Sequence, residues 1–177
     1  MASDKQIRTA LARARQAIEL RPSIACGTMK SSTRLERGLR CIYSNGDWKL
    51  EIDEPEAVGG DGSAPSPGVY GMAAISGCVA MSIKNLAVMA GIAVAAIDVG
   101  VEADYDDHGM FGLKPIPPAG FTGFRLDIAV DSEAPQEQIR EIVTRALETS
   151  SWHSVFARRQ KIEPRITIGR VTWTTEE

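Results

Sequence analysis

The run of residues 67–89 constrains the fold most, because it contains a single charged side chain, Lys84. Ser66 is a favoured residue just before a helix, and Pro67 fits the first helical position because its missing N–H would have no partner there. Gly91 is typical of the residue that ends a helix. Since a helix without a charged face must be covered on most sides, we expect a long helix over this run at the centre of the fold.

The apolar stretch 79–97 has the length of a membrane span. However, Lys84 and Asn85 lie near its middle, where a charge in hydrocarbon is costly. Gly91 then divides the stretch into an Ala/Met-rich half and a β-branched half. We therefore predict a buried helix followed by a strand, and no membrane partner.

The other hydrophobic patterns predict an α+β fold with antiparallel sheets around two main helices. Apolar residues three or four apart predict an amphipathic helix over residues 3–20 that ends before Pro22. Alternating residues predict an antiparallel meander over 26–53, in which Asn45-Gly46 forms a hairpin turn. A Gly- and Pro-rich loop, 54–68, precedes the central helix. Beyond that helix we expect strands over 92–105, 120–131 and 165–174, a turn at 106–109, an irregular segment at 110–119, an amphipathic helix from Pro135 and a short helix or turn at 151–159.

Charge and cysteine content narrow the class of protein. The net charge of −3 over 177 residues argues against a nucleic-acid binder, which usually carries a basic face. Three cysteines without CxxC spacing give neither a complete disulfide framework nor a structural zinc site, and they favour a reducing, cytoplasmic compartment. The segment 104–108, with three Asp and one His, lacks the Gly and distal Glu of a calcium loop. We read it as a solvated turn and expect no metal.

Cys78 is the most reactive group that the central helix carries. It belongs to a stripe of small and polar residues: Gly71, Ala74, Cys78, Ser82 and Asn85. The opposite stripe is Met72, Ile75, Val79, Ile83 and Leu86. Two interpretations stay open, because a buried free cysteine commonly serves as a small apolar side chain, whereas a reactive one needs a lowered pKa. Cys78 lies about three turns into the helix, beyond the reach of the helix dipole, so we expect a cation, most naturally an Arg, to lower that pKa.

Four segments in order resemble the OsmC/Ohr superfamily (osmotically inducible protein C and organic hydroperoxide resistance proteins). They are Asp53-Glu54-Pro55, Gly59-Gly60, Pro65-Ser66-Pro67 and the run from Ala73 to Cys78. The resemblance extends from about residue 27 to the C-terminus, so we divide the chain into an N-terminal helical arm, 1–22, and an OsmC-like domain, 23–177. It implies an α+β fold, an intertwined homodimer with two sites at the interface, a bacterial cytoplasmic setting and no cofactor.

The resemblance also implies a chemistry. In such proteins a Cys on the central helix attacks a peroxide and becomes a sulfenic acid, and a second Cys condenses with it to a disulfide that external thiols reduce. An Arg of the first hairpin holds the thiolate, and a Glu after the loop orients that Arg. Cys78 matches the peroxide-reactive Cys, and Arg37 matches the Arg. Arg34 and Arg40 are rivals for that role, and any of the three is alternatively a solvated strand charge.

Two positions depart from the family pattern. The Glu falls at Gly68 or Val69, and the second Cys falls at Ser151, which cannot form a disulfide. Cys26 or Cys41 would have to replace it, unless both are simple buried thiols. Further residues of the expected pocket are Ser82, Trp152 and His153, the last of which is alternatively a structural His at a helix end.

Three hypotheses follow for the function. The first is a single-cysteine thiol peroxidase that uses Cys78, a small organic hydroperoxide and an external thiol reductant. The second is a catalytically degenerate dimer of the same fold that binds a small apolar ligand or a partner in its interface pocket. The third is an interaction module, in which the N-terminal helix docks a partner or extends the dimer.

Overall fold

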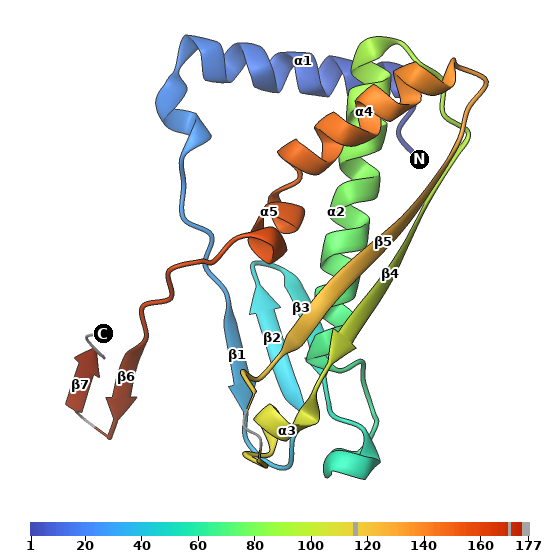
Figure 1. Cartoon of the computed structure of the whole chain (residues 1–177). Coiled ribbons are helices and arrows are strands. Elements are labelled where there is room, and N and C mark those ends of the chain that lie inside the picture. The colour runs from blue at the N-terminus through green and yellow to red at the C-terminus, as the bar shows by residue number, and fades with distance from the viewer. Residues whose placement is uncertain (115–116, 170, 175–177) are drawn as a thin grey trace.

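The computed structural model describes residues 1–114, 117–169 and 171–174, with only the backbone for the last range. The elements follow one another as α1 (Asp4–Leu20), η1 (Pro22–Ala25), β1 (Ser32–Leu35), β2 (Cys41–Asn45), β3 (Trp48–Ile52), η2 (Glu56–Val58), α2 (Pro67–Ala90), β4 (Ala96–Tyr105), α3 (Asp107–Met110), β5 (Phe121–Asp131), α4 (Gln136–Thr149), α5 (Ser151–Ala157), β6 (Arg165–Ile168) and β7 (Val171–Thr174). The predicted α+β class is confirmed, with α2 as the central element (Figure 1).

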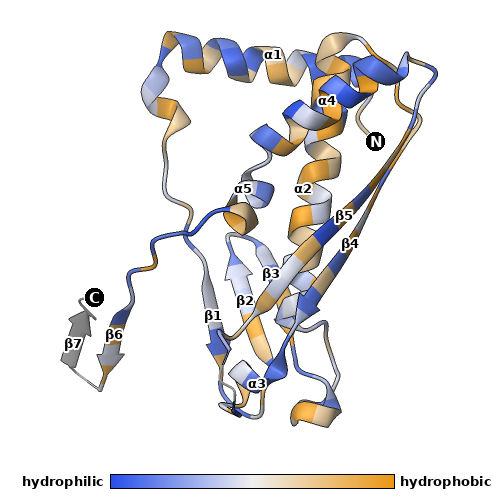
Figure 2. Ribbon diagram, viewed as in Figure 1, coloured by the Kyte–Doolittle hydropathy of each residue, from blue (hydrophilic) through white to orange (hydrophobic). Residues whose placement is uncertain are grey.

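Helix α2 begins and ends as its flanking residues predict. Ser66 has the extended backbone of a residue before a helix, and Gly91 ends the helix in the left-handed conformation at φ +75°. The fully buried side chains Ile75, Val79, Ile83 and Ala87 form one stripe of the helix. This stripe packs against α4 and against the inner faces of β4 and β5, and so forms the core (Figure 2).

By length and composition alone, α2 also passes for a membrane span. Its position in the structure gives it another role, because α4 and the β4–β5 hairpin cover its apolar stripe. Lys84 on the same helix is held by the Asp4 carboxylate at 2.9 Å and donates to the carbonyl of Val94 at 3.3 Å. These contacts identify α2 as the core helix of the fold.

The strands form three separate antiparallel sheets, β1-β2-β3, β4-β5 and β6-β7. The β4–β5 hairpin alternates apolar residues toward α2 with polar residues toward solvent (Figure 2). The sheet β1-β2-β3 packs chiefly within itself, and a hydrogen bond from the Tyr70 hydroxyl to the carbonyl of Glu51, at 2.7 Å, ties it to α2. The β6–β7 hairpin stands away from the other elements (Figure 1).

The hairpin turn and the last strand differ from their predictions. The turn between β2 and β3 is Gly46-Asp47, because Asn45 pairs with Trp48 in the ladder and Gly46 alone takes a positive φ, +56°. The predicted strand 165–174 is divided into β6 and β7 at Gly169, whose φ of +62° turns the chain back on itself.

Two boundaries near β4 also differ from their predictions. The strand begins at Ala96 and not at residue 92, because the Ile92 N–H still closes the end of α2 on the carbonyl of Ala87. The predicted turn at 106–109 is the one-turn helix α3, in which the Asp106 carboxylate accepts the N–H of His108 at 2.9 Å. Residues 115 and 116 of the predicted irregular segment lie outside the described residues.

The loop before α2 is organised by a buried carboxylate. Asp53 is 1% exposed, and it accepts hydrogen bonds from the backbone N–H groups of Glu54, Asp61 and Ser63 and from the Ser63 hydroxyl. Gly60 packs so tightly that a Cβ there would lie 1.8 Å from the carbonyl oxygen of Glu54. The Asp53-Glu54-Pro55 and Gly59-Gly60 segments therefore shape the loop that leads from β3 into α2.

Helix α1 lies across the C-terminal end of α2 (Figure 1). The Arg8 guanidinium donates to the carbonyl of Val88 at 3.0 Å, and Asp4 pairs with Lys84. The second half of α1 is exposed, with Leu20 at 79%. Asp4 and Arg8 thus hold the first half of this arm to α2, and the proposed division into 1–22 and 23–177 stays a prediction.

Candidate functional site around Cys78

Cys78 lies in the middle of α2, where α5 packs against that helix. The Ser150 hydroxyl donates to the Cys78 Sγ at 3.2 Å, and the Ser151 Oγ lies 3.6 Å from the same sulfur. The fold thus brings Cys78 together with the position at which the family pattern expects a second cysteine. Two serine hydroxyls meet the thiol there.

Ser150 is placed by the junction of two helices. Its N–H closes the last turn of α4 on the carbonyl of Ala146 at 2.9 Å, and its hydroxyl oxygen accepts the N–H of His153 in the first turn of α5 at 3.4 Å. The residue is 1% exposed. Sequence reasoning did not single out Ser150, although a serine between two helical patterns is a common signal for a helix N-cap.

Opposing effects set the pKa of Cys78. Burial raises it, because a charged sulfur is poorly solvated there. The Ser150 hydroxyl, the N–H of Trp152 and the hydroxyl and N–H of Ser151 lower it, and together they prevail, so the pKa lies below its ordinary value. The thiolate is the reactive form of cysteine, so this environment favours reactivity. The groups of the described chain that lower this pKa are all neutral donors, and the expected cation stays a prediction.

The three candidate arginines lie on or beside the first hairpin. Arg34 pairs with Glu36 at 2.7 Å, and Arg40 pairs with Glu51 at 2.6 Å. Arg37, in the β1–β2 connection, has no ion-pair partner among the described residues. All three line an open cleft of about 580 Å³ with Ser32, Glu36, Ile42 and Ser44. No hydrogen bond or ion pair among the described residues joins Arg37 to Cys78 of the same chain.

A cleft of about 380 Å³, with polar and apolar surface in similar shares, lies between β5, α2 and α5, and Cys78 is not among its lining residues. Its lining is Ile75, Phe121, Thr122, Gly123, Phe124, Leu126, His153, Phe156 and Ala157. The rings of Phe124 and Phe156 meet edge to face, and Trp152 contacts Phe156 at 6.3 Å between centroids. Of the residues expected in a pocket, His153 thus lines this cleft, Trp152 borders it and Ser82 is not among its lining residues.

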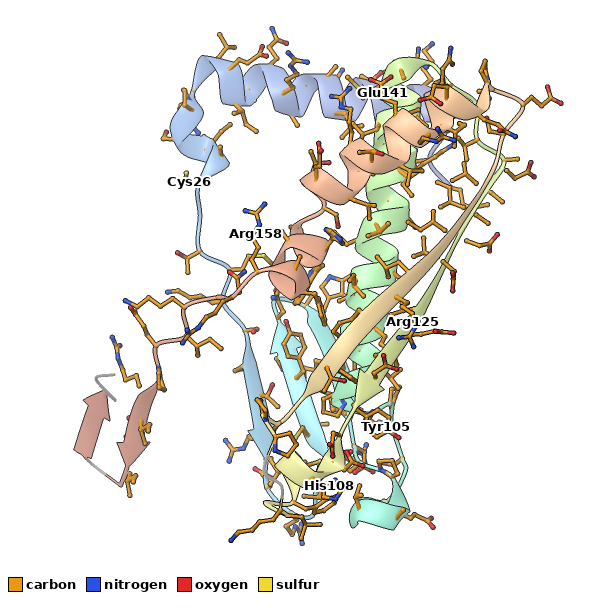
Figure 3. All side chains as sticks on the ribbon, viewed as in Figure 1. Cys26, Tyr105, His108, Arg125, Glu141 and Arg158 are labelled. Carbon is orange, nitrogen blue, oxygen red and sulfur yellow. The ribbon has the colours of Figure 1, made fainter. Side chains whose placement is uncertain are left out.

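The other two thiols have different surroundings. Cys26 is exposed at the end of η1, and Figure 3 places it below the outer end of α1, apart from α2. Cys41 begins β2, with its Sγ 3.7 Å from the carbonyl of Leu39. All three cysteines are free. Gly68 and Val69, where the family pattern expects a Glu, lie in the first turn of α2.

Two acidic side chains near residue 106 pair with basic side chains of the protein itself. Asp104 pairs with Arg125 across the β4–β5 hairpin, and the Asp106 carboxylate holds the His108 ring at 2.7 Å. Among the residues that the structure describes, no three His, Cys, Asp or Glu side chains converge as a metal site would require.

Comparisons with known proteins agree with this arrangement. A family model of OsmC-like proteins matches residues 60–165. A solved OsmC-like protein from Mycoplasma pneumoniae is 11% identical, with a TM-score of 0.62 over 74% of this chain and 88% of that one. An OsmC-like hydroperoxide resistance protein from Jannaschia is 20% identical, with a TM-score of 0.54 over 82% of this chain and 95% of that one.

A third solved structure is similar, an organic hydroperoxide resistance protein OsmC from Legionella pneumophila. It is 20% identical, with a TM-score of 0.51 over 73% of this chain and 89% of that one. No curated protein matches the sequence. At these identities the solved structures show a shared fold.

Proposed function

This chain belongs to the OsmC-like protein family, and on that premise we propose that it reduces organic hydroperoxides with external thiols, through Cys78 alone. The family, and solved relatives named as hydroperoxide resistance proteins, support a redox role in stress. The observation that carries the proposal is the Cys78 thiol, whose pKa the hydrogen bonds around Ser150 and Ser151 hold below its ordinary value.

The reaction needs two thiols per peroxide. The Cys78 thiolate attacks one peroxide oxygen, an S–O bond forms as the O–O bond breaks, and the leaving alkoxide takes a proton to become an alcohol. An external thiolate then attacks the sulfenic sulfur, which releases water and leaves a mixed disulfide. A second external thiolate reduces that disulfide and frees Cys78. The peroxide gains two electrons, and the two external thiols supply them as they form a disulfide.

Ser151 makes the external thiol necessary. The residue contacts the Cys78 sulfur, but a hydroxyl cannot form a disulfide. Cys41 and Cys26 lie on other elements, and neither contacts Cys78 among the described residues. In this proposal the sulfenic acid is therefore reduced by an external thiol that diffuses into the site.

The aromatic side chains of the cleft between β5, α2 and α5 support an organic peroxide as the substrate. Its walls carry the rings of Phe121, Phe124 and Phe156 beside Ile75, which lies one turn before Cys78 on α2. The apolar part of this cleft favours the hydrocarbon part of an organic hydroperoxide over hydrogen peroxide, because burial of hydrocarbon is favourable.

A homodimer completes the proposal. The single chain exposes 13908 Å², whereas a compact monomer of 19.1 kDa exposes roughly 8,400 Å². The sheet β1-β2-β3, with Leu35, Leu39 and Ile42 exposed, packs little against its own α2. A second copy would cover such surfaces and bring Arg37 of the partner subunit to Cys78. We place this dimer in the cytoplasm, a reducing compartment.

A coupled peroxidase assay tests the proposal. Wild-type protein should consume cumene hydroperoxide in the presence of dithiothreitol, and Cys78→Ala should lose that activity. Cys26→Ala and Cys41→Ala are matched controls that should retain it. Equal activity in Cys78→Ala and wild type would overturn the proposal.

A second candidate function is ligand binding without catalysis. The observation that favours it is the absence of a Glu in the first turn of α2, where Gly68 and Val69 stand. In that case the wild-type protein would be inactive in the same assay. A fluorescent apolar probe would bind the cleft, and the Phe124→Ser variant would bind that probe more weakly.

A further inference from the structure

The Ser150 hydroxyl is the shortest contact that the structure gives to the Cys78 sulfur. The oxygen lies 3.2 Å from Sγ, and that distance is within the limit for a hydrogen bond to sulfur. The side chain is 1% exposed, so water does not compete for the hydroxyl. The second serine, Ser151, is exposed and lies farther from the same sulfur, at 3.6 Å.

A neighbouring group fixes the direction of the Ser150 hydroxyl. Its oxygen accepts the N–H of His153 at 3.4 Å, so one of its lone pairs is occupied. The hydroxyl proton is then free to point at sulfur. A donor in this arrangement stabilises a thiolate more than a thiol, because a hydrogen bond to a charged group is stronger than one to a neutral group.

From this geometry we propose that Ser150 is a positioning residue, whose hydroxyl raises the thiolate fraction of Cys78 at neutral pH and lowers the nucleophilicity of each thiolate. The second effect follows because the attacking sulfur gives up negative charge in the transition state, so a donor holds the ground state more firmly. The role rests on the proposed function, since it concerns the same thiolate.

Two charged groups on the surrounding elements have other partners. Lys84, the one charge of α2, pairs with Asp4, and Arg140 of α4 pairs with Glu137. On α5, His153 lines the cleft between β5, α2 and α5. Arg37 of a partner subunit would favour the thiolate of every Ser150 variant alike, so it does not change the comparison below.

The test uses protein in which Cys78 is the only thiol, after Cys26→Ser and Cys41→Ser substitutions. The full chain reacts with 4,4′-dithiodipyridine, so that the Cys78 thiolate attacks one sulfur and releases a coloured thiopyridone. The second-order rate constant is measured from about pH 5.5 to about pH 10, a range that brackets the ordinary cysteine pKa. No peroxide takes part, so this result and that of the peroxidase assay are independent.

Without the Ser150 hydroxyl, the plot of rate constant against pH should cross that of the wild-type protein. In Ser150→Ala the inflection should move up by about one pH unit, the low end of what one hydrogen bond to a charged group gives. Nucleophilicity should rise about threefold, from a Brønsted coefficient of about 0.4–0.5. The variant should therefore react about threefold slower at neutral pH and about threefold faster above both inflections.

Controls separate this role from a structural one. Ser150→Gly removes the hydroxyl with little cost at a helix N-cap, and it should show the same crossing if Ser150→Ala unfolds. Ser150→Thr keeps the hydroxyl and should restore the wild-type inflection, whereas Ser151→Ala should move the inflection less. Folded Ser150→Ala and Ser150→Gly proteins with the wild-type inflection, or slower at every pH, would overturn the proposal.

Discussion

At Cys78, burial and hydrogen bonding act on the same sulfur in opposite directions. Burial raises the pKa and the donors of Ser150, Trp152 and Ser151 lower it, with a net decrease. Since the thiolate is the deprotonated form, a lower pKa means that reactivity appears at lower pH than for a free cysteine, whose pKa is about 8.5. Within one chain these donors are neutral, and the Arg that we expected beside the thiolate stays a prediction for the dimer.

A cysteine at position 151 should restore an internal resolving step. The Ser151 Oγ lies 3.6 Å from the Cys78 sulfur, so Ser151→Cys places two sulfurs close enough to bond after a modest side-chain rotation. One equivalent of cumene hydroperoxide should convert most of this variant to a disulfide between Cys78 and the introduced thiol. Non-reducing peptide mass spectrometry would detect it as a loss of two hydrogen masses.

Ser82→Cys is the matched control for that prediction. Residue 82 lies one turn beyond Cys78 on α2, and side chains four apart on a helix are about 5–6 Å apart at Cβ, too far for a disulfide. This variant should oxidise without forming the bond. An equal yield of internal disulfide in both variants, or none in Ser151→Cys, would contradict the geometry at the α4–α5 junction.

The sequence indicated Cys78 and Ser151 but not Ser150. Cys78 stands in a helical stripe of small residues, and Ser151 occupies a position that the family pattern marks. Ser150 gains its role because α4 ends and α5 begins at this residue, and because α5 then packs on α2. That contact joins residues 72 positions apart, and local patterns do not report such packing.

Among the elements, the loop between β3 and α2 depends most on one side chain. The pKa of the Asp53 carboxyl lies below its ordinary value, first because the N–H of Ser63 donates to it and then because the Ser63 hydroxyl does. The backbone N–H groups of Glu54 and Asp61 also donate to this carboxylate and lower its pKa further. Asp53 therefore stabilises the loop as an anion.

Asp53→Asn should destabilise the protein in a pH-dependent way. A carboxyl whose pKa is lower in the folded state contributes stability above its unfolded pKa, about 3.9, and loses it as the pH falls toward the folded value. The melting temperature of Asp53→Asn should thus fall clearly below wild type at about pH 7, and the difference should shrink near pH 3.

Asp61→Asn is the control for this loop. Its backbone N–H binds Asp53, but no hydrogen bond or ion pair of its side chain is seen in the described chain. This variant should melt close to wild type at both pH values. A pH-independent difference for Asp53→Asn, or an equal loss in Asp61→Asn, would contradict the role of the Asp53 anion.

Helix boundaries were more predictable than strand boundaries. The ends of α2 follow from Ser66, Pro67 and Gly91, which act locally. The start of β4 depends on where the ladder with β5 begins, at the hydrogen bond from Ala95 N–H to the carbonyl of Asp131. The register of a strand is set by a partner far along the chain, so residue patterns placed its start four residues too early.

At the scale of the whole molecule, the chain exposes far more surface than its mass requires. Its 13908 Å² exceed the expectation for a compact monomer by about 5,500 Å² per chain, and obligate dimer interfaces bury from about 2,000 to more than 5,000 Å² counted over both chains. The hairpin β6–β7 stands apart from the core (Figure 1), and the sheet β1-β2-β3 packs chiefly within itself.

The protein should therefore behave as a homodimer. Light scattering coupled to size exclusion should give about twice 19.1 kDa at low micromolar concentration.

Deletion of residues 1–20 removes the contacts of Arg8 and Asp4 with α2 and exposes the C-terminal end of α2. The deletion should lower the melting temperature, and a smaller particle would place the arm in the dimer. A stable monomer of the full chain would contradict the proposed assembly.

The most direct test of the central claim is intact-protein mass spectrometry after one equivalent of cumene hydroperoxide, with a sulfenic-acid trap, over a pH series. The account predicts rapid trapping at Cys78 alone that persists well below about pH 8, because the thiolate is already present there. Slow oxidation spread over Cys26, Cys41 and Cys78 alike would contradict it, since the site would then give the sulfur no special reactivity.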